Sequence, residues 1–259
     1  MMTFADLKLA ISPCPNDTYI FESFINETGV NAKFFDIEAL NDLAIGDDYD
    51  IIKVSYALLP QIDNKYQLLS SGSALGYGAG PLLVAKKEFA RNELDNLVIG
   101  IPGENTTANL LLKNYAPKVL TKSYIFSELI NKVLEKEIDA ALIIHETRFT
   151  YQNFGLKKIV DLGEWLEQKT GLPVPLGAIV AKKSLGETKI AEIEKLIKES
   201  ILAANSRLDK ITPFISSHAQ ELDQDTMRKH IALYVNDFSL DLGKKGREAI
   251  EQLLTPPLR

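Results

Sequence analysis

Short apolar runs alternate with longer amphipathic stretches along most of this 259-residue chain. The short runs contain β-branched residues and are flanked by Pro, Gly or Asn, which is typical of strands. They occupy residues 7–12, 32–37, 50–55, 81–87, 96–101, 139–145, 157–162 and 176–183. Intervening stretches such as "DTYIFESFIN" and "FSELINKVLEKE" have helical periodicity, and the pattern after residue 187 is almost wholly helical. Strands that alternate with helices predict an α/β architecture.

Two pairs of segments echo each other and indicate two similar lobes. "LKLAISPCPNDTYIFESFI" and "NLVIGIPGENTTANLLLKN" both place a proline, Asn and Thr between an apolar run and a helix. "DIIKVSY" and "DAALIIHE" both run from Asp through apolar residues to a polar end. We therefore predict two α/β lobes, each a mixed sheet flanked by helices. Ligands bind at the carboxyl ends of strands in such sheets, so residues 12–18, 53–55, 103–107 and 145–148 should border one cleft between the lobes.

Two glycine-rich segments, 71–87 and 170–183, are predicted to carry the chain from one lobe to the other and back. Residues 1–85 and 180–259 would then form a discontinuous first lobe, and residues 86–179 the second. Paired crossings of this kind act as a hinge in two-lobed proteins that close around a ligand.

Composition narrows the classes of partner. A net charge of −6, with basic and acidic residues mixed throughout, argues against a nucleic-acid partner. The single cysteine excludes an intramolecular disulfide and a cysteine-based metal cluster, and the three histidines lack zinc-ligand spacing, so we predict no metal site. The first residues lack the basic start and the apolar run of a secretory signal, and no apolar run nears the ~20 residues that span a membrane, so we expect neither a signal nor a membrane helix. These features predict a soluble, cytoplasmic protein with no membrane partner.

The segment "GENTTAN" at 103–109 lies between a predicted strand and a predicted helix. Asn105, Thr106 and Thr107 are good capping residues, and the free N–H groups of a helix start attract anions. An ordinary helix cap is the alternative interpretation. The pattern of a nucleotide-binding P-loop is missing.

Two further segments carry candidate ligand-binding residues. Lys53 lies inside the apolar strand that ends at Ser55, where it is either at a sheet edge or directed at an anionic ligand. In "SPCPNDT", the prolines stiffen the loop around Cys14. Cys14 is either a buried apolar thiol or a nucleophile that works with His145.

His145 is the best candidate for acid–base chemistry. It follows a predicted buried strand directly, and an ordinary imidazole pKa of about 6.5 leaves it neutral and able to accept a proton near neutral pH. Glu146 and Arg148 are candidates for orienting it or for binding substrate, without an assigned role. His218 and His230 lie in the polar helical part of the chain and are interpreted as surface or helix-packing residues.

Several motifs together resemble the 1,4-dihydroxy-6-naphthoate synthases of the futalosine route to menaquinone: "SPCPNDT", "KVSY", "SGSALGYGAGPL", "LIIHETRFTY", "VDLGEWLEQKTGLPVPLGAI" and "YVNDFSLDLG". The resemblance covers most of the chain. It implies a two-lobed periplasmic-binding-protein-like type II fold and a carbon–carbon lyase. The expected reaction converts cyclic dehypoxanthinyl futalosine to 1,4-dihydroxy-6-naphthoate with release of dihydroxyacetone, and needs no metal or organic cofactor.

The same resemblance implies the roles of individual residues. His145 corresponds to the proton acceptor, and the expected substrate contacts are Lys53, Val54, Ser55, Thr106 and Thr107. The expected ligand is a small carboxylate, and the protein is expected to be a monomer or homodimer. Two alternatives remain open: a solute-binding protein of the same fold without catalysis, and chorismate dehydratase, the sister enzyme of the route.

Overall fold

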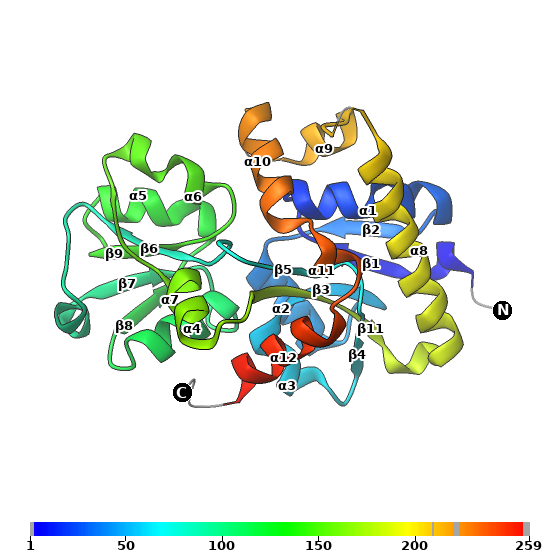
Figure 1. The fold of residues 1–259 in the computed structure, drawn as a ribbon, viewed down its shortest axis with the longest axis horizontal. Coiled ribbons are helices and arrows are strands. Elements are labelled where there is room, and N and C mark those ends of the chain that lie inside the picture. The colour runs from blue at the N-terminus through cyan, green and yellow to red at the C-terminus, as the bar shows by residue number, and fades with distance from the viewer. Residues whose placement is uncertain (1–2, 209, 220–222, 256–259) are drawn as a thin grey trace.

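A computed structural model describes residues 3–208, 210–219 and 223–255, and it contains two sheets flanked by helices (Figure 1). The first sheet has the strand order β2-β1-β3-β11-β4, with β5 paired to β11, and the second has the order β10-β6-β9-β7-β8. The strands are β1 Lys8–Ile11, β2 Asn31–Phe34, β3 Ile51–Ser55, β4 Tyr66–Leu68, β5 Ala74–Gly76, β6 Leu82–Ala85, β7 Val98–Ile101, β8 Leu120–Ser123, β9 Ala140–Ile143, β10 Lys157–Asp161 and β11 Val174–Lys182.

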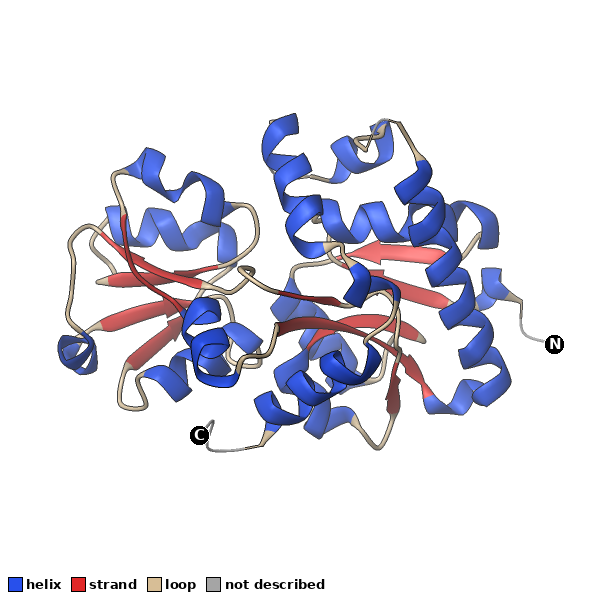
Figure 2. Ribbon diagram, viewed as in Figure 1, coloured by secondary structure: helices blue, strands red, loops and turns tan. Residues whose placement is uncertain are grey.

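Helices cover both sheets and make up most of the described chain after β11 (Figure 2). They are α1 Pro15–Thr28, α2 Ile37–Gly46, α3 Leu59–Ile62, α4 Thr107–Tyr115, α5 Leu129–Leu134, α6 Thr147–Thr150, α7 Leu162–Thr170, α8 Glu187–Ser206, α9 Pro213–His218, α10 Gln224–Tyr234, α11 Asp237–Leu240 and α12 Gly243–Leu254. Within the described ranges, none of these helices is long and apolar enough to span a bilayer.

The two sheets have the same arrangement of strands, as the two similar pairs of sequence segments predict. β1 pairs in parallel with β2 and β3, and β7 pairs in parallel with β8 and β9. An antiparallel strand then follows in each sheet: β11 beside β3, and β6 beside β9. Both sheets are therefore mixed. The helices after β1 and β7, α1 and α4, start at the same edge of their sheets, which brings corresponding loops toward a common cleft.

All eight predicted strands are present, and three strands were missed. β4 and β5 have only three residues each. β8 has the sequence "LTKS", is largely exposed and lies at the edge of its sheet. A short or polar edge strand lacks the apolar run that identifies a buried one, because one of its sides has no neighbour to pack against.

The chain crosses between the sheets twice, within the two predicted glycine-rich segments. It leaves the first sheet after β5 and enters the second at β6, and it returns between α7 and β11. Each strand hydrogen-bonds to one sheet only, so β6 belongs with the second sheet and the whole of β11 with the first. The chain therefore passes from one sheet to the other a few residues before residues 85 and 179, the predicted limits of the lobes. Those limits stay a prediction of the domain boundaries.

Close packing of two glycines holds the first crossing against the second lobe. A Cβ added at Gly80 would lie 2.1 Å from the Cα of Gly163, at the start of α7. We expect Gly80→Ala to lower the free energy of unfolding by about 1–3 kcal/mol, because α7 must shift to admit the methyl group.

Urea unfolding measures this effect, with Gly29→Ala as the control. Gly29 has a left-handed φ of 67° but no atom within 4 Å of an added Cβ, so its substitution adds backbone strain without a clash. A smaller effect at Gly80 than at Gly29 would contradict the packing argument.

Candidate active site

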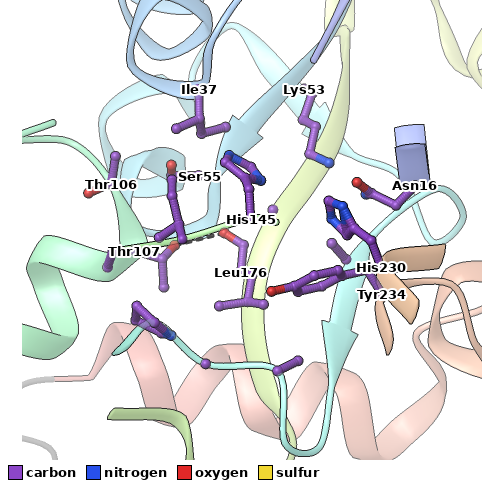
Figure 3. Close-up of a pocket in the computed structure, with 17 residues that line it drawn as sticks. Asn16, Ile37, Lys53, Ser55, Thr106, Thr107, His145, Leu176, His230 and Tyr234 are labelled. Carbon is purple, nitrogen blue, oxygen red and sulfur yellow. Dashed lines mark hydrogen bonds between the residues drawn. The ribbon is translucent and has the colours of Figure 1, made fainter. Parts of the chain in front are cut away.

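A pocket lies where strand ends of both sheets meet (Figure 3). All four predicted strand-end segments contribute to its lining: Asn16 from the first, Lys53 and Ser55 from the second, Thr106 and Thr107 from the third, and His145 from the fourth. Apolar side chains, including Ile37 and Leu176, complete the wall. The predicted cleft between the lobes is therefore present.

The two threonines at the start of α4 have different partners. The Thr106 hydroxyl accepts a hydrogen bond from the Asn109 N–H (3.2 Å) and donates to the Gly103 carbonyl (2.7 Å), so it is a helix cap as well as a lining residue. The Thr107 hydroxyl donates to the Leu176 carbonyl (2.9 Å) and accepts from the Ala57 N–H (3.3 Å). Thr107 thus joins the second lobe to β11 and to the short 3-10 helix Tyr56–Leu58 that follows β3. The start of α4 still presents its dipole to the pocket.

Glu38 of α2 forms a second connection between the lobes. One carboxylate oxygen accepts hydrogen bonds from the Asn105 backbone N–H (3.0 Å) and side-chain amide (3.1 Å). The other accepts from Asn41 (3.0 Å), whose amide also binds Ser55 at the end of β3. A Cβ at Gly103 would lie 2.3 Å from the Glu38 carboxylate, so only glycine leaves room for this contact. Asn105, one of the three predicted capping residues, binds Glu38, and Thr106 is the N-cap of α4.

Lys53 is buried in the middle of the first sheet. β3 lies between β1 and β11, so the alternative of a sheet-edge lysine is wrong. The Lys53 ammonium pairs with the Asp17 carboxylate of α1, and both side chains are 5% exposed or less. Asp17 also accepts from the Ser12 hydroxyl (2.6 Å) and the Asn16 amide (2.8 Å). These hydrogen bonds fix the loop between β1 and α1, and the ion pair neutralises the charge of Lys53.

Val54 differs from its two neighbours in the strand. Lys53 and Ser55 line the pocket, whereas Val54 is fully buried in a core cluster. Alternate residues of a strand point to opposite faces. The Val54 side chain is therefore not part of the pocket lining, and any contact with a ligand would come from its backbone.

His145 lies at the junction of β9 and α6 in a strained backbone conformation. Its φ is +58°, in the left-handed region that non-glycine residues rarely adopt. The ring is half-buried, packs edge-on against Phe126 and places Nδ1 3.4 Å from the Cys14 sulfur. Burial, with the nearby charge of Lys53 as a second cause, lowers the pKa of His145 to about 3. The imidazole is therefore neutral near neutral pH.

Cys14 is close to His145 but is poorly suited to act as a nucleophile. Burial, reinforced by the negative charge of Glu146, raises the pKa of the Cys14 thiol well above its ordinary value. A thiol needs its thiolate form to attack. Because the adjacent imidazole is also neutral, this pair lacks the charge separation of a cysteine–histidine nucleophile.

Three potential metal ligands lie together in the described part of the chain. Ligand atoms of Cys14, His145 and Glu146 lie within 4.8 Å of one another. One interpretation of the sequence placed Cys14 beside His145, although the two are 131 positions apart, but it did not predict a trio with Glu146.

Arg148 supports the wall of the pocket. Its guanidinium donates to the Gly80 carbonyl (3.0 Å) and pairs with Asp161 (3.2 Å), whose carboxylate also caps α7. The side chain therefore ties together the first crossing, α6 and α7. This arrangement explains Arg148 as a structural residue of the second lobe.

The structure adds two residues from α10 to the pocket, His230 and Tyr234. His230 is only 1% exposed, so of its two interpretations the surface residue is wrong and the helix-packing residue is correct. Its ring lies 4.6 Å from the Tyr234 ring and 6.2 Å from the His145 ring, measured between centroids. The buried face of α10 includes Met227, His230, Ile231 and Tyr234, which are spaced three or four residues apart. This helical spacing is the signal in the sequence that could have placed His230 and Tyr234 in the interior.

Comparisons with known proteins agree with this arrangement. Residues 7–256 match the model of a family described as menaquinone biosynthesis. The chain is 39% identical to a 1,4-dihydroxy-6-naphthoate synthase of Streptomyces coelicolor, with 98% of this chain and 93% of the relative covered. It is 40% identical to the enzyme of the same name from Thermus thermophilus, with 95% of this chain and 92% of the relative covered.

Solved structures confirm the predicted fold. A protein of Archaeoglobus fulgidus superposes with a TM-score of 0.90 at 31% identity, over 95% of this chain and 94% of that one. A Candida albicans protein described as having the generic periplasmic binding protein fold has a TM-score of 0.63 at 13% identity, over 98% and 90% of the two chains. The latter likeness concerns the fold alone. With matches over nearly its whole length, the chain belongs to the menaquinone biosynthesis family.

Proposed function

We propose that the protein is a 1,4-dihydroxy-6-naphthoate synthase, a carbon–carbon lyase that converts cyclic dehypoxanthinyl futalosine to the naphthoate with release of dihydroxyacetone. The observation that carries this proposal is a neutral, strained histidine at a pocket between two lobes, in a chain 39% and 40% identical to synthases of that name. Backbone strain in folded proteins is concentrated at functional sites.

His145 is the proposed proton acceptor. As it removes a proton from a substrate hydroxyl, the O–H electrons form the carbonyl of dihydroxyacetone and the carbon–carbon bond breaks. The electron pair of that bond enters the ring system, which takes the proton back from the imidazolium and becomes aromatic. The imidazolium that results needs a compensating charge, because burial disfavours it. Glu146 directly follows His145 and has a carboxylate oxygen within 4.8 Å of it, so it is placed to supply that charge.

The proposed carboxylate site is at the start of α4. N–H groups of a helix start and hydroxyls suit a carboxylate, and here Thr106 and Thr107 line the pocket next to Ser55. Lys53 contributes its aliphatic part and the donors that Asp17 leaves available. We propose Lys53, the Val54 backbone, Ser55, Thr106 and Thr107 as substrate contacts.

Catalysis by these residues requires neither a metal nor an organic cofactor in the proposed mechanism. The protein is proposed to act in the cytoplasm as a monomer or homodimer. These assignments rest on the family and on the chemistry of the proposed step.

Entry of the substrate requires the lobes to separate. The pocket holds about 70 Å³ of free volume, several-fold less than the roughly 300–1,000 Å³ of pockets for drug-sized ligands. Glu38 with Asn105, and Thr107 with Ala57, connect the lobes and would break on opening. Their re-formation around the substrate would exclude water during the reaction.

The test is incubation of the intact protein with cyclic dehypoxanthinyl futalosine, followed by absorbance and mass detection of the naphthoate. Formation of 1,4-dihydroxy-6-naphthoate and dihydroxyacetone in equal amounts is the expected result. Binding without turnover would instead indicate a solute-binding protein, which the fold also supports. Dehydration of chorismate in a parallel incubation would assign the sister activity.

A further inference from the structure

A second imidazole faces the pocket beside the proposed base. His230 reaches the pocket from α10, in the helical part of the chain that packs on α1. Its side chain is 1% exposed, and its Nδ1 atom is buried without a hydrogen-bond partner among the described residues. An unsatisfied buried polar atom costs about 1–3 kcal/mol relative to a satisfied one, so its position in a ligand pocket indicates that a ligand satisfies it.

The two ends of the pocket differ in their chemistry (Figure 3). Thr106, Thr107 and the start of α4 form one end, where N–H donors and the helix dipole favour negative charge. Asn16, His230 and Tyr234 form the other end, with His145 between the two.

The side chains that form the end around His230 are uncharged. Burial lowers the pKa of His230 well below its ordinary value, so its imidazole is neutral. Lys53 and Arg148, whose charges also act on this imidazole, are paired with Asp17 and Asp161. Amide, phenol and neutral imidazole groups can each donate and accept hydrogen bonds. Hydroxyl groups of a ligand have the same dual character, whereas a carboxylate only accepts and is better matched by the α4 end.

We propose that His230 binds the hydroxylated three-carbon part of the substrate, the part that leaves as dihydroxyacetone, at the end of the pocket opposite Thr106 and Thr107. This inference rests on the proposed function. The ring centroids of His145 and His230 are 6.2 Å apart, so a hydroxyl bound to one imidazole is within reach of the other. His145 then accepts the proton while His230 holds the leaving fragment in position.

The test uses His230→Phe, which removes both ring nitrogens, with His230→Gln as a second variant that keeps an amide near the position of Nε2 but none at Nδ1. For each we would measure kcat and KM with cyclic dehypoxanthinyl futalosine, and the Kd for 1,4-dihydroxy-6-naphthoate, which lacks the three-carbon part. We expect kcat/KM to fall by about tenfold or more, as for a lost substrate hydrogen bond, while the Kd for the naphthoate stays within about twofold of the intact protein.

His218→Phe is the matched control. His218 is a histidine of the neighbouring helix α9 whose Nδ1 lies 2.8 Å from the Phe214 carbonyl and whose ring packs on Phe34, outside the pocket lining. It should leave both kcat/KM and the naphthoate Kd unchanged. Thr107→Val, at the carboxylate end, should weaken naphthoate binding.

The outcomes separate this inference from the proposed function. If the intact protein makes no naphthoate, the proposed function fails, and the role of His230 fails with it. If the intact protein is active, an unchanged kcat/KM in both His230 variants overturns the inference alone. A naphthoate Kd weakened as much as in Thr107→Val also overturns it, because His230 would then contact the part of the ligand that remains. Melting temperatures of all variants identify any that are unfolded.

Discussion

Replacing His145 with asparagine is expected to lower kcat for naphthoate formation by about 10²–10⁴-fold, the usual contribution of a general base. Asparagine tolerates the left-handed backbone that His145 adopts, with φ of +58°, so the local fold should be retained. The side-chain amide cannot accept a proton at neutral pH. Steady-state rates with cyclic dehypoxanthinyl futalosine measure the effect, and the melting temperature of the variant tests its fold.

The pH profile of the intact protein gives an independent check on His145. Its pKa is lowered to about 3, so the imidazole stays neutral well below the ordinary value near 6.5. We expect no acid limb attributable to His145 in kcat/KM between about pH 5 and 7. The unfolded chain takes up this proton below about pH 6.5 while the folded protein does not, so stability from this group is lost as pH falls from 6.5 toward 3. An acid limb in this pH range would contradict the low pKa of His145. In the variant experiment, an undiminished rate of naphthoate formation in His145→Asn would exclude His145 as the base.

Replacing Asp17 with asparagine is expected to cost about 3–5 kcal/mol of stability, because it leaves the ammonium of Lys53 buried without a counter-charge. The Asp17 and Lys53 side chains are 0% and 5% exposed, so solvent cannot compensate. The carboxylate also holds the Ser12 hydroxyl and backbone N–H, so the loop before α1 should loosen. Urea unfolding at neutral pH measures the loss.

Two variants test the cause of this effect. Adding Lys53→Met to Asp17→Asn removes the stranded charge and should restore much of the stability. Glu88→Gln breaks an ion pair between Glu88, whose side chain is 78% exposed, and Lys157, whose side chain is 57% exposed. This substitution should change the free energy of unfolding by less than about 1 kcal/mol. Equal effects of Asp17→Asn and Glu88→Gln would show that burial of the first pair is unimportant.

The pattern of the chain predicts the architecture well because the buried strands are continuous apolar runs. β3 and β9 are buried along their whole length, and the strand–loop–helix repeat around α1 and α4 is enough to indicate two similar lobes. β8 was not predicted, because its residues are largely exposed and polar and form no apolar run. Where a strand packs on only one side, its sequence is free to vary and the signal disappears.

The sequence predicted those residues of the candidate site that lie at or near the ends of strands. Lys53, Ser55, Thr106, Thr107 and His145 do meet in one pocket. Glu38 and His230 were not predicted, because they lie in helices whose residues look ordinary by themselves. Asp17 lies in the predicted segment 12–18, but its pairing with Lys53 was not predicted. Asp17 is 36 residues from Lys53, and Glu38 is 67 from Asn105. Contacts between such distant positions depend on how the lobes pack.

The place of β11 in the first sheet has a consequence for synthesis of the protein on the ribosome. All five strands of the second sheet lie between residues 82 and 161 and can pair as soon as that segment has emerged. The first sheet needs β11, at residues 174–182, which pairs with β3, β4 and β5. The first sheet, whose other strands are translated first, therefore stays incomplete until the second sheet has been synthesised. During this time the edge of β3 that later pairs with β11 has no partner strand. Chaperone protection is most needed during that interval, when the exposed β3 edge offers a template for aggregation.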